Sequence, residues 1–539
     1  MKGIKSFYIG PFLIAVVIFC SCLLGQKVFD MNLRKTGQAG TVVDTDYGSF
    51  LAAQHALYVN DFDAASKMIN SVKTDNKNVA EIKKLTDFFG GKMPENAESL
   101  KDSKDVVNGL IYDAFLIQKD DWKSVYKRHN KDSSVLSAPI RIFSGSKTGN
   151  PKDTAKFISS IKADENWKSF VRGQIAVLNN DIDTAAKEFA KVHPEFMNVN
   201  DYLYLMSFYK NNDMVEDMKI LRDDFVAKVG GMYMLQYEDV PDWSNYDGYK
   251  NNLVFSLIQT VSHTQIMIYT DFSLMFLRFA EIISDGNYQD AINYYLGQYY
   301  FHNNGDFATS FNKISKSNPL YLFGQLKIAE NNKDIRALEK IVRQNPLFVP
   351  AVQVIGRESI KRGDKSLALS VINRALKQKG LSDQGRVFFL KQRAYVYIMF
   401  GDAKRAQKDL DVVRDMEYKM TPDYVALQAR AWAMQDKNLD TAYDYAMSLI
   451  KMNTSDISAW DLLSQIIEKK EGVANALEIL ERVGEITPTS AVYEHLGDFY
   501  KKQGDKERAK KAYMRALDLS DDYLIVVPHV QKKIRKLKW

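Results

Sequence analysis

The body of this 539-residue chain has no cysteine. Its two cysteines, Cys20 and Cys22, both lie in an apolar segment at the N-terminus. Disulfide staples, cysteine-containing zinc sites and cysteine nucleophiles are therefore excluded from the body. Proline (12 residues) and glycine (28 residues) are scarce for this length, and no Gly/Ser-rich or Pro-rich linker divides the chain. A chain several domains long without linkers grows most simply by repeating helical units.

Charge of one sign is also lacking. The chain has 73 basic and 67 acidic residues, and the net charge of +6 does not indicate a nucleic-acid groove. Positive charge does collect at the C-terminus, at Lys532, Lys533, Arg535, Lys536 and Lys538. We interpret this run as the end of a capping helix, where the helix dipole favours cations, and contact with phosphates or acidic lipid is the alternative.

Motifs for catalysis or cofactor binding are missing too. The seven histidines are scattered, with no pair at i, i+4 and no HExxH, and neither GxSxG nor GxGxxG occurs. The stretch Ser144 to Gly149 lacks the first glycine of a phosphate loop, and we expect a Gly/Ser turn there. Adjacent carboxylates such as Asp120 and Asp121 would diverge on a helix and act as caps at a helix start. The sequence therefore predicts no catalytic residue, no cofactor and no metal.

One long hydrophobic run is present. Residues 7–24 carry no charge and follow Lys2 and Lys5, and at about 1.5 Å per residue they nearly cross a hydrocarbon core of about 30 Å. Basic residues ahead of the run predict a cytoplasmic N-terminus and an exported body. Three interpretations stay open for residues 1–35: an uncleaved anchor, a cleaved secretory signal, and a lipoprotein signal in which Ser21 precedes an acylated Cys22. We expect residues 36–48 to link this segment to the body.

The body shows internal repetition. Small residues recur at Ala368, Ala406, Ala442, Ala476 and Ala509, with separations of 38, 36, 34 and 33 residues. Near the C-terminus, Gly497 and Ala509 are small enough to let two helices of a hairpin cross closely, and Gly504-Asp505 turns the chain between them. The larger residues Leu496, Tyr500 and Tyr513 would fill the seam, with Ala516 one turn further on.

This pattern resembles the tetratricopeptide repeat, and residues 487–520 follow it almost position for position. Earlier segments keep the turn and the small residue of the second helix. They are Gly363-Asp364 before Ala368, with Gly356 on the preceding helix; Gly401-Asp402 before Ala406; Gly286-Asn287-Tyr288 before Ala291; Asn180-Asp181 before Ala185, with Gly173 on the preceding helix; and Asn60-Asp61 before Ala65.

The resemblance implies an all-α fold, a right-handed superhelical solenoid of antiparallel helix pairs. Residues 276–520 would form the regular solenoid, residues 49–275 a degenerate helical-repeat region, and residues 521–539 a basic C-terminal capping helix. Within the degenerate region, Gly90-Gly91, Gly230-Gly231 and the aromatic run from Tyr233 to Tyr249 indicate interrupted hairpins and a longer loop. The stretches 318–321, 438–442 and 495–498 are similar to exported tetratricopeptide proteins of alphaproteobacteria, which implies a location in the cell envelope.

A stack of such hairpins leaves a concave surface lined by the first helices, and surfaces of this kind bind extended peptides or partner helices. Candidate groove residues on first helices are Arg393, Gln428, Arg430 and Asp461, for which a plain solvated helix face is the alternative. Helical spacing places Tyr295 and Tyr299 on one face, which we assign to the core.

We therefore predict a scaffold in a bacterial cell envelope. Its body would be periplasmic on an inner-membrane anchor, or held by a lipid, and it would bind other proteins for assembly, secretion or export. Two alternatives remain open at this stage. One is an enzyme with an unrecognised site in residues 100–275, and the other is a structural spacer that associates with itself.

Overall fold

The computed structural model describes residues 45–537, apart from residues 133, 135–136, 230–247, 264–269, 285, 287, 380, 418–419 and 521–524. The predicted membrane segment with Cys22, most of the predicted linker, Gly230-Gly231 and residues 233–247 of the aromatic run lie outside the described residues. Helices are the only regular elements in the described part of the chain, as the all-α prediction requires. No helix among these residues combines the length and apolarity needed to cross a membrane.

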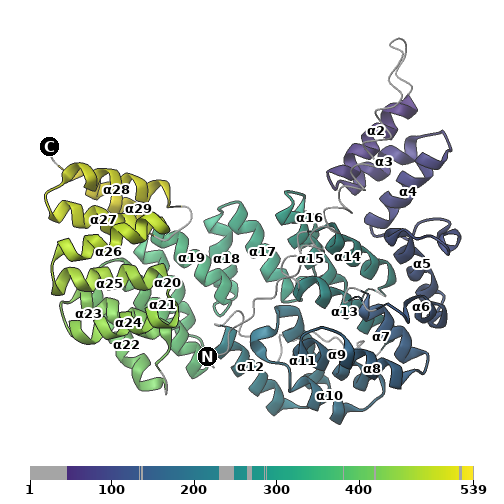
Figure 1. Cartoon of the computed structure of the whole chain (residues 1–539), viewed down its shortest axis with the longest axis horizontal. Helices are drawn as coiled ribbons and strands as arrows, with labels where there is room; N and C mark the ends of the chain where they lie inside the picture. Colours follow the sequence, from purple (N-terminus) through teal and green to yellow (C-terminus); the bar gives the residue numbers. More distant parts are fainter. Residues whose placement is uncertain are drawn as a thin grey trace. The chain divides into compact units, whose positions relative to one another are not determined.

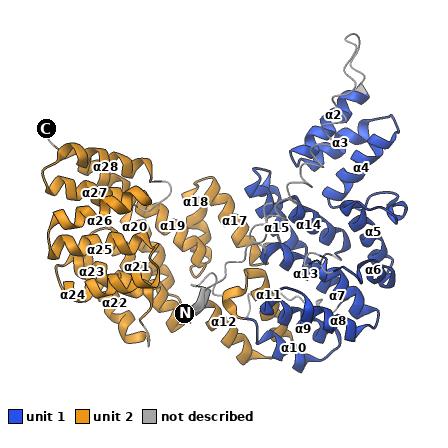
Figure 2. Ribbon diagram, viewed as in Figure 1, with its two compact units in different colours: residues 1–192, 243–315 blue, residues 193–242, 316–539 orange. Residues whose placement is uncertain are grey.

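The described residues form two compact units (Figure 2). Unit 1 comprises the chain up to residue 192 together with residues 243–315, and unit 2 comprises residues 193–242 and 316–539. The predicted boundary between residues 275 and 276 falls inside a helix, Asp271–Ile283, and the one between residues 48 and 49 falls inside Thr45–Tyr58. Both boundaries therefore cut elements that the structure leaves whole.

Within the described residues, unit 1 contains thirteen α-helices and one short 3-10 helix (Figure 1). Their bounds are α2 (Thr45–Tyr58), α3 (Phe62–Ser71), α4 (Lys77–Phe89), the 3-10 helix η1 (Ala97–Leu100), α5 (Val106–Gln118), α6 (Trp122–His129), α7 (Ala138–Lys147), α8 (Pro151–Ser160), α9 (Glu165–Leu178), α10 (Ile182–Phe189), α13 (Tyr249–His263), α14 (Asp271–Ile283), α15 (Gln289–His302) and α16 (Phe307–Asn312). Neighbours in sequence pair as antiparallel hairpins, among them α2 with α3, α9 with α10 and α15 with α16.

Unit 2 contains the more regular hairpins. Its elements are the 3-10 helix η2 (Pro194–Phe196), α11 (Val199–Asn211), α12 (Val215–Val229), α17 (Leu320–Asn331), α18 (Ile335–Gln344), α19 (Val349–Arg362), α20 (Lys365–Leu376), α21 (Asp383–Met399), α22 (Ala403–Met416), α23 (Pro422–Met434), α24 (Leu439–Met452), α25 (Ile457–Lys470), α26 (Val473–Ile486), α27 (Ser490–Lys502), α28 (Lys506–Asp518) and α29 (Val527–Arg535). From α17 onward, each second helix packs against the first helix of the next hairpin. The first helices α21, α23, α25 and α27 also contact one another in series.

Several turns between paired helices share one geometry, among them those of α2/α3, α9/α10, α17/α18, α21/α22 and α27/α28. A residue in the left-handed region, such as Asn180 (φ 57°) or Gly504 (φ 88°), precedes an Asp whose side chain caps the second helix. The backbone N–H of Asp505 donates to the carbonyl of Tyr500, five residues earlier, at 2.9 Å. This closure satisfies the last carbonyl groups of the first helix, and glycine or asparagine adopts the left-handed conformation at least cost. It explains why Gly-Asp and Asn-Asp mark the turns in the sequence.

Small residues let the paired helices cross closely at some hairpins. A Cβ atom built on Gly497 would lie 2.5 Å from the ring of Tyr513, and one on Gly173 would lie 2.3 Å from the ring of Phe189. A Cβ atom built on Gly297 would likewise lie 2.4 Å from the Phe311 ring. No real side chain fits at such distances, so these glycines allow a large ring to fill the seam.

Three sequence-based interpretations are wrong in detail. A Cβ atom on Gly356 would meet nothing within 4 Å, so this glycine does not mark a close crossing. Residues 138–147 form α7 and bury Ser144 and Gly145, so the predicted Gly/Ser turn is a helix end, and the chain turns only at Gly149 (φ 80°). Gly286 precedes α15, which is the first helix of a hairpin with α16 and not a second helix as we expected for Ala291.

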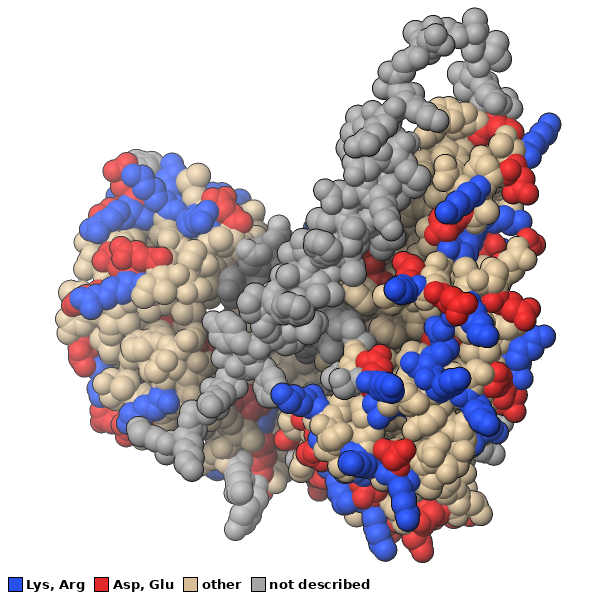
Figure 3. Space-filling model, turned by 45° about the vertical axis from the view of Figure 1, so that its right-hand side comes forward, with Lys and Arg blue, Asp and Glu red and all other residues tan. Residues whose placement is uncertain are grey.

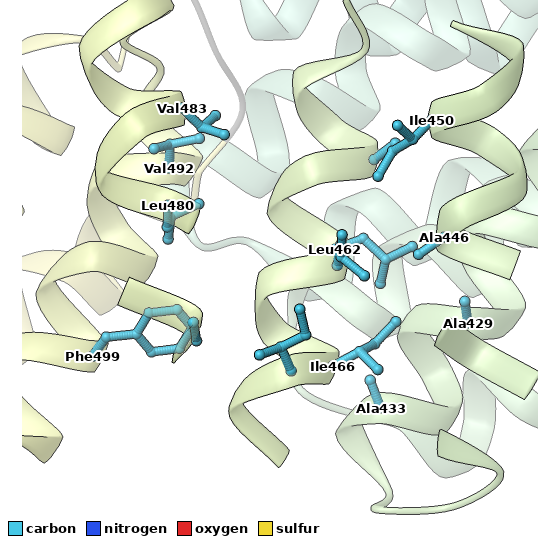
Figure 4. Close-up of a cluster of buried hydrophobic side chains, with 14 of the residues drawn as sticks. Ala429, Ala433, Ala446, Ile450, Leu462, Ile466, Leu480, Val483, Val492 and Phe499 are labelled. Carbon is cyan, nitrogen blue, oxygen red and sulfur yellow. The ribbon is translucent and has the colours of Figure 1, made fainter. Parts of the chain in front are cut away.

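The core of unit 2 is a continuous apolar layer between hairpins. Figure 4 shows one of its clusters, to which α23 to α27 contribute buried side chains, among them Leu462, Ile466 and Leu480. The repeating alanines Ala442 and Ala476 are fully buried in this layer, and so are Ala368 and Ala406 in earlier hairpins. Each alanine lets neighbouring helices approach without leaving a void.

Candidate functional site

A cleft of about 780 Å³ lies within unit 2, on the side where first helices line up. Helices α21, α23, α25 and α27 supply most of its walls, each contributing residues one repeat apart. The lining mixes apolar and charged side chains: Tyr395, Ile398, Met399, Arg430, Ala433, Met434, Ile457, Ser458, Asp461, Gln465, Glu468, Lys469, Thr489, Ala491, Val492, Glu494, His495, Asp498, Phe499, Lys501, Lys502, Ile525, Val526 and His529. A concave, partly apolar surface with convergent polar groups is the usual form of a binding site.

The C-terminal helix α29 borders this cleft. Ile525, Val526 and His529 line it, and the ring of His529 lies 5.9 Å from that of Phe400 at the end of α21. Lys533 forms ion pairs with Glu494 at 2.8 Å and with Asp498 at 2.6 Å. Burial opposes the charge on Lys533, but the two carboxylates outweigh it and raise the pKa of this amine.

The apolar side of α29 covers the last hairpin. Val530 is fully buried and packs in one cluster with Ala509, Tyr513 and Ala516 of α28. The described part of residues 521–539 is therefore a helix that caps the stack, as the amphipathic sequence suggests, and its basic residues face solvent or the acidic edge of the cleft.

A buried ionic network forms the floor of the cleft. The carboxylate of Asp461, on α25, accepts a hydrogen bond from Nδ1 of His495, on α27, at 2.6 Å, and lies 3.5 Å from Arg430 on α23. Burial alone would raise the pKa of Asp461, but His495 and Arg430 outweigh it and hold this pKa below its usual value. Burial alone would likewise lower the pKa of His495, and Asp461 reverses the effect and raises it. Three successive hairpins are joined by one shared carboxylate.

The four predicted groove residues do not all face the cleft. Arg430 and Asp461 line it, but Asp461 is only 2% exposed and spends its hydrogen-bonding capacity within the protein. Gln428 is 1% exposed and exchanges hydrogen bonds with Gln407 at 2.7 and 3.1 Å. Arg393 donates two hydrogen bonds, of 2.7 and 2.8 Å, to the carboxylate of Asp409. The prediction of Gln428 as a partner contact is wrong, because its side chain is buried between α22 and α23. Arg393 does not line the cleft, and its contact with a partner stays a prediction.

The predicted packing residues of the last repeat are divided between two seams. Gly497 of α27 faces Tyr513 of α28, which is fully buried with Ala509 and Ala516, whereas Leu496 packs on the other side of α27, next to Gly484 of α26. Tyr513 donates its hydroxyl hydrogen bond to Asp498 at 2.7 Å, and Tyr500 donates to Glu481 at 2.6 Å. Burial, assisted by Glu481, raises the pKa of Tyr500 to about 12.

Sequence reasoning missed exposed residues of the cleft, such as Met434 and Lys501, and the role of His495. One signal was available for His495. It lies 34 residues after Asp461, one repeat length, and Lys502 lies 34 residues after its ion-pair partner Glu468. Residues one repeat apart occupy the same position on consecutive first helices, so opposite charges at this spacing indicate a contact between hairpins.

Metal binding has no support in the described residues. No group of three or more His, Cys, Asp or Glu side chains lies there in an arrangement that could hold an ion.

A family model described as a tetratricopeptide repeat matches residues 490–523, which span α27, α28 and the residues that follow. The last hairpin is therefore a tetratricopeptide repeat, and the predicted repeat at 487–520 is confirmed. The model covers this hairpin and not the rest of the chain. A search of curated proteins finds no match.

Solved structures provide a weaker likeness. A tetratricopeptide repeat protein from Parabacteroides merdae aligns with 16% identity and a TM-score of 0.32, covering 54% of this chain and 99% of its own. The Cut9-Hcn1 hetero-tetramer of the APC/C aligns with 13% identity and a TM-score of 0.30, covering 96% and 99%. Yeast Tom70 aligns with 13% identity and a TM-score of 0.32, covering 91% and 99%. At these scores the alignments carry no argument of their own, and the helical-repeat fold rests on the hairpins described above.

Proposed function

We propose that this tetratricopeptide repeat chain is a non-catalytic scaffold that binds other proteins in the cleft of unit 2 and is held at a bacterial membrane by its N-terminal segment. The observation that carries the proposal is the cleft itself. Four consecutive first helices line it, and it offers both apolar side chains and charges. Repeats of this kind bind peptides or helices through many modest contacts along such a surface.

The exposed lining suits an amphipathic segment of a partner. Met434 is 39% exposed, and a flexible thioether adapts to different apolar side chains. Lys501 is exposed and faces the same cleft, where it could pair with a carboxylate of a partner. A partner helix or extended peptide with apolar residues next to an acidic one would match both features.

The membrane tether and the envelope location rest on the sequence of residues 7–24, which are long and apolar enough to hold the chain at a bilayer. An acylated Cys22 would serve the same purpose. Mass spectrometry of the mature N-terminus separates the two: an intact Met1 supports the uncleaved anchor, an acylated Cys22 supports the lipoprotein, and a cleaved, unacylated N-terminus contradicts the tether.

Co-purification from crosslinked cells tests the binding function. The double variant Met434→Glu, Lys501→Glu reverses the character of the cleft, and the matched control Met452→Glu, Lys451→Glu makes the same changes on α24 at exposed residues outside it. We expect discrete proteins to co-purify with the wild type and the control but not with the cleft variant. Recovery of only further copies of this chain would instead favour a self-associating spacer.

A further inference from the structure

Unit 1 contains a second hollow, of about 900 Å³, between the end of α6, α7 and α8. Four cationic side chains line it, Lys131, Arg141, Lys156 and Lys162, against a single carboxylate, Asp153. The hollow thus has a net charge of +3 by count. The prediction of a scaffold that binds proteins in unit 2 assigns no role to it.

The sequence around the hollow carries an excess of positive charge. Residues 119–172 contain 12 Lys and Arg against 6 Asp and Glu, a net charge of +6 that equals the net charge of the whole chain. The rest of the chain is therefore neutral in sum. Figure 3 turns this side of unit 1 forward and shows Lys and Arg side chains standing along it, with Asp and Glu between them. Local excess of one sign, not the overall charge, determines which partner such a surface attracts.

Among the described residues, Arg141 forms no ion pair with a carboxylate and is held by other contacts. Its guanidinium lies 3.8 Å from the centre of the Phe157 ring and donates a hydrogen bond of 2.5 Å to the backbone carbonyl of Asp132. Stacking and one neutral acceptor orient the group but leave its charge uncompensated and its other donors available. An arginine fixed in this way is prepared for an anion with several oxygens.

The three lysines of the hollow are also available. Lys131, Lys156 and Lys162 are exposed, and none forms an ion pair with any residue in the described ranges. The floor beneath them is rigid, because Phe157 and Ile161 are buried and Gly145 brings α7 close to α6 and α8. A Cβ atom on Gly145 would lie 2.9 Å from both Tyr126 and Thr154.

We propose that this hollow binds the phosphate-bearing headgroup of an anionic phospholipid. Its volume exceeds that of a free phosphate ion, and its four cationic side chains offer several donors to the oxygens of a phosphate-bearing headgroup. A nucleic acid fits less well, because Phe157 is covered by Arg141 and offers no free face on which a base could stack. The choice of a lipid over a soluble phosphate compound rests on the proposed membrane tether.

Native mass spectrometry of the full chain in a neutral detergent tests the proposal. Phosphatidylglycerol is titrated against phosphatidylcholine, with the variant Lys131→Gln, Lys156→Gln, Lys162→Gln beside a control, Lys77→Gln, Lys101→Gln, Lys104→Gln, that removes the same charge from exposed positions of unit 1 outside the hollow. We expect the wild type and control to retain phosphatidylglycerol selectively, and the hollow variant to bind it about tenfold or more weakly. Arg141→Lys, which keeps the charge but lacks the planar fork, should also weaken binding.

Three results would overturn the proposal. Equal losses in the control and the hollow variant would show diffuse charge and no site, and an unchanged hollow variant of native helicity would show that the hollow is not used. Competition by glycerol phosphate at the same concentration as the intact lipid would assign the hollow to a soluble phosphate compound. Binding of duplex or single-stranded nucleic acid through the same lysines, without lipid binding, would assign it to nucleic acid. Crosslinking from position 434 tests the cleft of unit 2 alone. The scaffold proposal can therefore fail while the lipid proposal holds, and the two outcomes are distinguishable.

Discussion

Units 1 and 2 are both built from helical hairpins, but they differ in whether other helices of the same unit cover these hairpins. In unit 1, helices α13 and α14 return and pack against the earlier hairpins, α13 against α7 and α9, and α14 against α4 and α5. As a result every residue from 251 to 261 of α13 is buried. In unit 2 the first helices α21 to α27 line a cleft that stays open among the described residues, although α29 contacts α19 and supplies part of the lining, and α12 contacts α21. A repeat architecture thus provides a binding surface only where the chain does not cover its own concave face.

The chemistry of the two interiors differs accordingly. Aromatic rings dominate around α13, where Phe255 stacks on Phe170 at 5.5 Å and lies 5.6 Å from Tyr288. In unit 2, ion pairs join the two helices of a hairpin, as Arg393 on α21 does with Asp409 on α22, and also join neighbouring hairpins, as Asp461 on α25 does with His495 on α27. We conclude that unit 1 gains stability from a filled core, and unit 2 combines an apolar layer with polar contacts that leave its cleft accessible.

The largest expected change in stability comes from comparing the buried helix α13 of unit 1 with the open cleft of unit 2. Phe255→Ala in α13 should destabilise unit 1 by about 3–5 kcal/mol, because it removes a fully buried ring from an aromatic cluster. Met434→Ala in the open cleft should change stability by only about 0.5 kcal/mol. Hydrogen exchange read separately for each unit across a urea series measures both changes. Equal sensitivity of the two positions would contradict the comparison.

The second effect distinguishes two glycines with similar sequence context. Gly497→Ala should cost about 1–3 kcal/mol, because the new methyl group would overlap the buried Tyr513 ring. Gly356→Ala should instead stabilise the chain by up to about 1 kcal/mol, since its Cβ meets open space and alanine is the better helix former. Thermal unfolding of the two variants under the same conditions compares them. If Gly356→Ala lowers the stability as much as Gly497→Ala does, the overlap with the Tyr513 ring does not explain the cost at Gly497.

A pH series tests the ionic floor of the cleft. Because the pKa of His495 is raised in the folded state, its pairing with Asp461 contributes fully below the ordinary value of 6.5 and is lost as pH rises through the folded pKa. Because the pKa of Asp461 is lowered, the same contribution also disappears as pH falls below 3.8. The wild type should exceed His495→Gln by about 1–2 kcal/mol near pH 5–6 and by less at pH 9. Denaturant unfolding at each pH measures this difference, and a gap that widens with pH would contradict it.

The smallest expected effect concerns an exposed ion pair within one helix. Arg482 and Glu478 on α26 are 2.8 Å apart but 74% and 69% exposed. Arg482→Ala should therefore cost only about 0.2–0.5 kcal/mol and lose this effect in about 1 M salt. Thermal unfolding at low and high salt provides the check. If Arg482→Ala destabilises the chain more than His495→Gln does, ion pairs between hairpins are not stronger than exposed ion pairs within one helix.

Much of the hairpin pattern was predictable from sequence. The pairs Asn180-Asp181, Gly401-Asp402 and Gly504-Asp505 gave the turns, since few residues adopt the left-handed conformation and Asp caps the next helix. The turn at Lys333-Asp334 escaped notice, because lysine rarely takes the left-handed region and here adopts φ 51°. Its geometry is the same as that of the other turns.

The internal packing of unit 1 and the lining of the cleft were not predictable. Helix α13 carries a polar row, Asn252, Ser256 and Gln259, which by type predicts a solvated face, but residues 251–261 are buried all round, so its sequence does not say which helices surround it. Gln428 and Asp461 look like surface residues by type, and only their partners one hairpin away explain their burial. Periodicity identifies a helix and its inner face, but tertiary contacts decide whether that face meets a neighbour, a returning helix or solvent.

Crosslinking from single positions tests the central claim most directly. A photoreactive amino acid is placed at Met434 inside the cleft and, for comparison, at Met452 on α24, which is 70% exposed and outside it. In cells, we predict that position 434 captures one or a few discrete proteins and position 452 captures none of them. Equal capture from both positions, or adducts only with other copies of this chain, would contradict a scaffold that binds its partners in the cleft.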